Sequence, residues 1–157
     1  MRPHSLSRSA PSTVNANTIA SSLLSVETRG TGFTDITREV AKFLREAGAR
    51  EGTVTLFIRH TSASLTIQEN ADPSVLQDLT TALNRLAPEN AGWVHDTEGP
   101  DDMPAHIKTM LTSVSLQIPV LNGEMALGTW QGIYVAEHRA QPHRREIVLQ
   151  FIGSATQ

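Results

Sequence analysis

Alternating apolar and polar residues in several segments constrain the fold most, because a period of two is typical of a strand with one buried face. The last of these segments contains the run Ile147–Ile152, which is apolar on both faces and therefore predicts a central strand. The pair Asn122-Gly123 is a strong signal for a tight turn between strands. The predicted strands are Thr18–Glu27, Thr53–His60, Ala63–Glu69, Ser113–Val120, Met125–Glu137 and Arg145–Ile152.

Three helices are predicted between these strands. The first starts at Thr34 or Asp35 and stops near Gly48, and the second starts at Asp72-Pro73. The third starts at Asp102. We expect two apolar stripes to face the core, one in the second helix and one in the third: Val75, Leu76, Leu79, Leu83 and Leu86, then Met103, Ile107, Met110 and Leu111. The predicted fold class is α+β, with a mixed or antiparallel β-sandwich-like core and about three packed helices.

Composition narrows the organisation and the partners. A chain of 157 residues that is 39% apolar is sufficient for one domain, predicted over residues 18–157, after a flexible Ser- and Pro-rich tail at 1–17. The net charge of −3 and the pI near 6.0 favour neither a nucleic-acid nor a membrane partner. The lack of cysteine excludes disulfides and thiolate chemistry and fits a cytoplasmic location. Any metal must be held by nitrogen and oxygen ligands.

Histidines are the main candidates for chemistry. Of six histidines, three lie near the ends of predicted elements, at positions 60, 95 and 106. Neutral imidazoles bind zinc and similar ions, so His60, His95 and His106 are candidate metal ligands. Asp102 lies four residues before His106, on the same face if both are helical, and is a candidate ligand or ligand-orienting carboxylate. The alternatives are that each histidine is a core residue and that Asp102 only caps the helix.

Three further segments carry candidate functional residues. Glu69 ends a strand on its apolar face, where it serves either in chemistry or in a structural ion pair. The basic segment 138–145 matches a phosphate-bearing small molecule, or is a solvated turn. In the segment Gly128–Gly132, glycines interrupt a strand beside polar residues, which favours a site wall over a buried subunit contact.

Several of these segments, in this order, resemble the YjbQ-like proteins, a family described as secondary thiamine-phosphate synthases. The resemblance covers about residues 18–153. It rests on His60–Thr66, Glu69–Pro73, His95–Lys108, Gly128–Ile133 and Glu137–Arg139.

The resemblance implies a compact α+β domain, a homotrimer, and a site near the subunit boundaries. It also implies a weak or secondary activity that joins hydroxymethylpyrimidine diphosphate to thiazole phosphate and releases pyrophosphate. We assign the matching polar positions as catalytic (Glu69, Asp102, Glu137), as substrate- or phosphate-binding (Asn70, Lys108, Gln131, Arg139, Arg145) and as metal-binding (His60, His95, His106).

Three functions are therefore considered. The first is the transferase, in which a divalent cation and basic side chains stabilise the pyrophosphate that leaves. The second is a metal-dependent hydrolase of a phosphorylated small molecule, with Glu69 or Glu137 as general base. The third is a trimer that binds phosphorylated metabolites without catalysis. Imidazole ligands favour zinc over magnesium, whereas pyrophosphate release normally uses magnesium.

Overall fold

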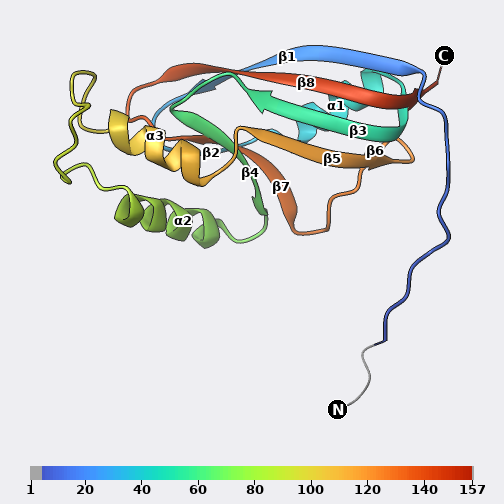
Figure 1. The fold of residues 1–157 in the computed structure, drawn as a ribbon, viewed down its shortest axis with the longest axis horizontal. Coiled ribbons are helices and arrows are strands. Elements are labelled where there is room, and N and C mark those ends of the chain that lie inside the picture. Colours follow the sequence, from blue (N-terminus) through green and yellow to red (C-terminus); the bar gives the residue numbers. More distant parts are fainter. Residues whose placement is uncertain (1–4, 157) are drawn as a thin grey trace.

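The computed structural model describes residues 5–156 as an α+β fold with two antiparallel sheets (Figure 1). The five-stranded sheet has the order β1-β8-β3-β5-β6, and the three-stranded sheet has the order β2-β7-β4. The strands are β1 (Thr18–Thr28), β2 (Gly32–Asp35), β3 (Ala49–Ile58), β4 (Ala63–Glu69), β5 (Ser115–Leu121), β6 (Glu124–Met125), β7 (Gln131–Glu137) and β8 (His143–Ala155). The helices are α1 (Thr37–Glu46), α2 (Pro73–Leu86) and α3 (Asp102–Leu111).

Both sheets contribute to one hydrophobic core, which confirms the predicted α+β class. Val54, Leu56 and Ile58 of β3 alternate into this core and are almost fully buried, as the period of two predicts. They meet Leu65 of β4 and Val135 of β7 from the smaller sheet within the same cluster. The inner faces of the two sheets thus pack on each other, and α1 adds its apolar side to the same core.

The central strand and the tight turn follow the prediction. β8 pairs with β1 on one side and with β3 on the other, both antiparallel. Its inner face is buried, but on its outer face Ile152 is 46% exposed. Asn122 and Gly123 have φ of 55° and 82°, so both adopt the left-handed conformation that a two-residue hairpin turn requires.

The prediction of one continuous strand over Met125–Glu137 is wrong. The chain pairs only as the short β6 and as β7, and the glycine-containing segment between them leaves the ladder. Gly128 N donates to Gln131 Oε1 at 2.8 Å, which closes a local turn before β7 begins. The four-residue strand β2 was not predicted, because it is too short for a clear period.

The apolar stripe of α2 is not buried as predicted. The start of the helix is as expected, since Asp72 accepts a hydrogen bond from Ser74 N and Pro73 occupies the first turn. No residue of α2 is buried, however, and Leu86 is 67% exposed. The helix lies along the lower edge of the molecule in Figure 1, where it covers little of the sheet.

The buried face of α3 is also different from the prediction. Met110 and Leu111 are 77% and 52% exposed, whereas Asp102 and Lys108 are buried. The helix is rotated so that a polar face points inward, because Asp102 and Lys108 find ionic and hydrogen-bonding partners there. Apolar periodicity cannot anticipate such a rotation.

Residues 5–17 form no helix or strand and are exposed throughout. The first four residues of the predicted tail lie outside the described residues. Across 5–156 the structure contains no helix that is both long enough and apolar enough to cross a membrane.

Candidate metal centre at the start of α3

Three of the predicted residues converge at the N-terminal end of α3. One ligand atom each from His95, Asp102 and His106 lies within 4.8 Å of the other two. His95 Nε2 is 2.6 Å from Asp102 Oδ2, and His106 Nε2 is 3.3 Å from the same oxygen. The two rings are tilted against each other with centroids 5.5 Å apart. We call these residues the His–Asp–His trio.

Local structure explains how the trio forms. Asp102 and His106 are four residues apart on α3, so they lie one above the other on the same face. His95 comes from the loop before the helix and contacts the same carboxylate oxygen as His106. Asp102 is 2% exposed, while the two imidazoles remain partly exposed. The Asp102 carboxylate is therefore buried, and the two imidazoles lie between it and solvent.

The tautomer of His106 is set by the backbone. Its Nδ1 donates to the carbonyl oxygen of Thr61 at 2.9 Å, because a carbonyl can only accept. In a neutral ring the lone pair of Nε2 then points toward Asp102 Oδ2. That arrangement is favourable only if a proton or a cation lies between the two atoms. A backbone carbonyl that orients the far nitrogen is a common feature of metal-binding histidines.

Arg139 holds the other oxygen of Asp102. Its Nη1 donates to Asp102 Oδ1 at 2.6 Å, its Nε donates to Asp101 Oδ2 at 3.1 Å, and its Nη2 donates to the carbonyl of Glu98 at 2.7 Å. Burial would raise the pKa of Asp102, but the hydrogen bond from His95 and the charge of Arg139 outweigh it, and the pKa falls below its usual value. Asp102 therefore stays anionic.

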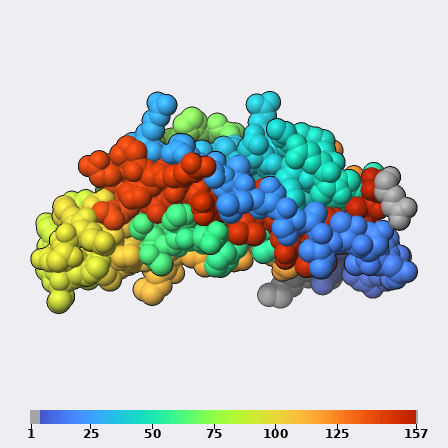
Figure 2. Space-filling view, turned by 90° about the horizontal axis from the view of Figure 1, so that it is seen from above, coloured from blue at the N-terminus to red at the C-terminus, as the bar shows by residue number. Residues whose placement is uncertain are grey.

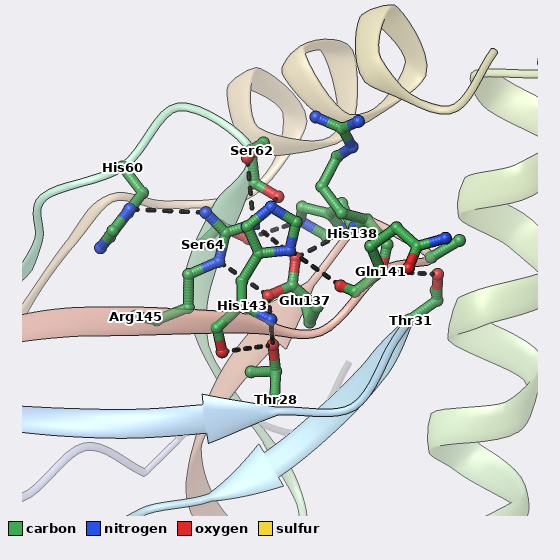
Figure 3. Close-up of polar contacts among 12 residues, drawn as sticks. Thr28, Thr31, His60, Ser62, Ser64, Glu137, His138, Gln141, His143 and Arg145 are labelled. Carbon is green, nitrogen blue, oxygen red and sulfur yellow. Dashed lines mark hydrogen bonds and ion pairs between the residues drawn. The ribbon is translucent and has the colours of Figure 1, made fainter. Parts of the chain in front are cut away.

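Three other predicted residues, His60, Glu137 and Arg145, form a second cluster, which Figure 3 shows. Arg145 binds Glu137 through two parallel hydrogen bonds of 2.7 and 2.5 Å, and both side chains are buried. Thr28 Oγ1 donates to the same carboxylate at 2.7 Å. His60, just past the end of β3 rather than within the strand as predicted, accepts a hydrogen bond from Glu146 N at its Nε2 and lies beside Arg145.

The residues of this second cluster bind one another and the backbone, whereas the sequence predicted that they bind metal and phosphate or act in catalysis. His60 is not within the trio, because its Nε2 lone pair is used by the backbone and its Nδ1 lies 3.4 Å from the Arg145 guanidinium. Burial and that positive charge lower the pKa of His60. Burial would raise the pKa of Glu137, but the bonds from Arg145 and Thr28 lower it overall. In both Arg145 and Arg139 all three guanidinium nitrogens contact partners within the chain, so neither side chain presents an open fork to phosphate.

Lys108 is buried between α3 and α2 instead of facing an open site. Its Nζ donates to Asn84 Oδ1 at 2.6 Å, and burial lowers the pKa of the amine. His138 is buried nearby and hydrogen-bonds through Nε2 to Ser64 Oγ at 2.8 Å. Burial and the charge of Lys108 lower the pKa of His138 to about 4, so this ring is neutral.

The remaining predicted residues lie at the far end of the smaller sheet. Glu69 of β4 pairs in register with Gln131 of β7, whereas Glu137 at the other end of β7 pairs with Ala63. Gln131 and Glu137 are six positions apart along the strand, which is about 20 Å. Asn70, next to Glu69, donates to Thr129 O at 3.3 Å. Glu69, Asn70 and Gln131 are therefore not brought to the trio within one chain.

A hollow of about 540 Å³ opens beside the trio, and we call it the His106 hollow. Hydroxyl side chains from the β3–β4 turn and the end of α3 line much of it, and the buried Thr109 hydroxyl has no hydrogen-bond partner among the described residues. The hollow is lined by His60, Thr61, His106, Thr109, Met110, Thr112, Ser113 and Val114. A ligand on the trio would thus have space next to it.

Sequence reasoning missed several residues that build this site. Glu98 Oε2 lies 3.7 Å from His95 Nε2, and the side chain is 66% exposed. Asp101 anchors Arg139 and also accepts from Ala140 N at 2.8 Å. The adjacent acids Asp101 and Asp102 were a signal in the sequence that a cation lies nearby. No period or motif, however, indicates that they share one arginine 37 residues or more away.

The family of the chain follows from comparison with known proteins. The family model described as "UPF0047 protein YjbQ-like" matches residues 22–154. The chain belongs to the YjbQ-like UPF0047 family.

Relatives and solved structures agree with this membership. The chain is 46% identical to a UPF0047 protein of Synechocystis over 83% of this chain and 90% of that one, and 45% identical to YjbQ of Salmonella typhimurium over 78% and 89%. A crystal structure of a family member from Clostridium acetobutylicum superposes with a TM-score of 0.77 at 38% identity, covering 82% of this chain and 98% of that one. A Sulfolobus solfataricus structure described as a YjbQ-like protein of unknown function has a TM-score of 0.78 at 20% identity, with 87% and 100% covered, and supports the fold alone.

Proposed function

We propose that this protein is a metal-dependent hydrolase that acts on a small phosphorylated molecule. The observation that carries the proposal is the His–Asp–His trio beside the open His106 hollow. Two imidazoles and one carboxylate suit zinc better than magnesium, which prefers oxygen ligands.

The trio fits a cation in three respects. The Thr61 carbonyl fixes His106 so that Nε2 can act as a ligand atom. Arg139 takes the other oxygen of Asp102, which leaves Oδ2 directed at the two imidazoles. Three protein ligands leave a coordination position for substrate or water. A zinc ion held there would neutralise phosphate charge and make a nearby water molecule more acidic.

Hydrolysis also needs a general base from the chain itself. In hydrolysis, the oxygen of water bonds to phosphorus, the P–O bond to the leaving oxygen breaks, the water proton passes to a base, and the leaving oxygen takes up a proton to become an alcohol. Glu98 is the carboxylate best placed to accept that proton, because it is exposed and lies beside His95. Glu137 is sealed by Arg145, and Glu69 lies at the far end of the sheet. The geometry therefore favours Glu98 over the two bases predicted from sequence.

The transferase predicted from the family resemblance is supported less well. It needs cationic side chains for the pyrophosphate that leaves, and Arg139, Arg145 and Lys108 are each bound within the chain. A non-catalytic phosphate-binding role at the trio needs the same free cations. The hydrolase requires only the trio, the hollow and a base.

A homotrimer remains part of the proposal. The half-exposed apolar side of α2 and the exposed Met110 and Leu111 of α3 support self-association, since α2 and α3 are joined through Lys108 and Asn84. Analytical ultracentrifugation should give three times the chain mass. A monomer at micromolar concentration would remove the trimer from the proposal.

Activity of the full chain tests the hydrolase. Protein stripped with a chelator is assayed on p-nitrophenyl phosphate and a panel of sugar and nucleoside phosphates, with and without added Zn²⁺. We expect zinc-dependent turnover that falls at least about 100-fold in His106→Gln, while His143→Gln, at a half-buried histidine outside the trio, keeps the wild-type rate. Equal rates in His106→Gln and wild type would refute the proposed site.

A second pair of variants tests the base. Glu98→Gln should lower kcat by about 100-fold or more and leave zinc affinity within a few-fold of wild type. Glu69→Gln should change neither. The same protein incubated with the two thiamine precursors tests the transferase, which would be favoured if thiamine phosphate forms and no phosphate ester is hydrolysed.

A further inference from the structure

A second hollow of about 540 Å³ lies between α1 and the turn that joins β5 to β6, and we call it the α1 hollow. One side of α1 forms a wall, since Thr37, Ala41, Leu44 and Arg45 recur at the spacing of one helical face. The volume is within the range of about 300 to 1,000 Å³ that small-molecule sites occupy. Figure 1 shows α3 at one end of the molecule and the β5–β6 hairpin toward the other, so this hollow is separate from the trio.

The base of the α1 hollow is apolar. Leu44 and Ala49 are buried in the core, and they reach the hollow from α1 and from the start of β3. Met125 and Leu127 are half-buried against the same core. A ligand placed there would bury an apolar body against these side chains.

Two arginines flank this apolar base. Arg45 and Arg50 line the hollow, and neither guanidinium makes an ion pair or a side-chain hydrogen bond with any residue of 5–156. Arg139 and Arg145, at the trio end, are paired on every side. The lining also includes one acidic residue, Glu124, so the two arginines leave an excess of positive charge. Guanidinium groups match the oxygens of carboxylate and phosphate through parallel hydrogen bonds.

Backbone contacts fix the walls of the hollow. Gly123 N donates to Arg50 O at 2.8 Å, which ties the hairpin turn to β3. Thr156 N donates to Gly48 O at 2.8 Å, which ties the C-terminal segment to the end of α1. A Cβ at Gly48 would lie only 2.8 Å from Thr156 Oγ1, so glycine allows this close approach. Little ordering would therefore be required when a ligand binds.

We propose that the α1 hollow binds a small amphipathic anion, with its carboxylate or phosphate group on Arg45 and Arg50 and its aliphatic part on the apolar base. The two head groups share the same recognition chemistry. Space-filling Figure 2 shows α1 in cyan on the upper surface, away from the yellow segment that precedes α3. The site is thus independent of the proposed hydrolase, and each can fail without the other.

Calorimetric titration of the full chain with octanoate and with octyl phosphate tests the proposal, and octanol serves as the uncharged probe. We expect saturable binding of at least one anion, at least tenfold weaker binding of octanol, and at least tenfold weaker anion binding by the double variant Arg45→Gln/Arg50→Gln. Arg38→Gln is the matched control, because Arg38 is an exposed arginine of the same helix that does not line the hollow. Tighter octanoate binding assigns a carboxylate ligand, and tighter octyl phosphate binding assigns a phosphate ligand.

A steric variant keeps the test valid if the charge variant unfolds. Ala41→Trp fills the hollow without changing charge, and it should weaken anion binding at least tenfold while circular dichroism stays native. The proposal is overturned if neither anion binds the wild type, or if a folded Arg45→Gln/Arg50→Gln variant binds as tightly as Arg38→Gln.

Discussion

The trio and the Glu137–Arg145 cluster lie next to each other and use the same residue types, but their surroundings differ. Arg139 joins them, since its backbone N donates to Glu137 and its guanidinium donates to Asp102. In the trio both imidazoles are partly exposed and His106 lines a hollow, while in the second cluster the charges of Glu137 and Arg145 are buried under β1 and the β3–β4 turn. The comparison shows that the same ionic residue types form one cluster whose imidazoles are open to solvent and one cluster whose charges are buried and paired.

The largest effect on stability should come from breaking the buried Glu137–Arg145 ion pair. Arg145→Met leaves the Glu137 carboxylate buried without its cation, which should lower the free energy of unfolding by about 3 to 5 kcal/mol. Urea denaturation measures this loss. Arg59→Met, which removes an exposed pair with Glu146, should cost less than about 1 kcal/mol. Similar losses in both variants would contradict the distinction between the two clusters.

Acid should destabilise the fold through the buried His138. The unfolded ring has a pKa near 6.5 and the folded ring has a pKa of about 4, so between these values the unfolded chain binds more protons. The free energy of unfolding should therefore fall as the pH drops from 6.5 to 4, by about 3 kcal/mol in total from this residue. Urea titrations at several pH values should show that His138→Gln loses this slope and His143→Gln keeps it. A slope unchanged in His138→Gln would count against a neutral buried ring.

Zinc should bind the trio and not the buried Glu137–Arg145 pair. At a zinc concentration of 100 times Kd, the wild type should gain about 2.7 kcal/mol of stability. His95→Gln should lose that gain while its metal-free stability changes by less than about 1 kcal/mol, because the ring is 46% exposed. Thermal unfolding with and without zinc measures both. A full zinc response in His95→Gln would show that the trio is not the metal site.

The smallest effect is expected at the far end of the smaller sheet. Glu69 accepts hydrogen bonds from Asp72 N at 3.0 and 3.3 Å, so Glu69→Ala should cost about 0.5 to 1 kcal/mol through the start of α2. The zinc response should be unchanged. If Glu69→Ala abolishes that response, then Glu69 contributes to the metal site, which would require a second copy of the chain.

Part of the site was predictable because it depends on local spacing. The four-residue step from Asp102 to His106 needs only a helix, and the helix that the sequence predicts from Asp102 is present. The inclusion of His95 over His60 was not predictable, since it depends on how the loop before α3 folds back onto the carboxylate. The rotation of α3 was hidden for a similar reason, because its buried polar side relies on partners from distant segments.

The sequence by itself determined the strands with alternating residues, the central position of β8, the Asn122-Gly123 turn and the capped start of α2. Each of these depends on neighbours along the chain, so short-range patterns are sufficient. Only the tertiary structure decided which arginines are paired and which are free, and which carboxylates are sealed. Those outcomes depend on contacts such as that between Arg145 and Ser62, 83 residues apart. A local sequence pattern does not indicate which distant side chain will pair with a buried charge.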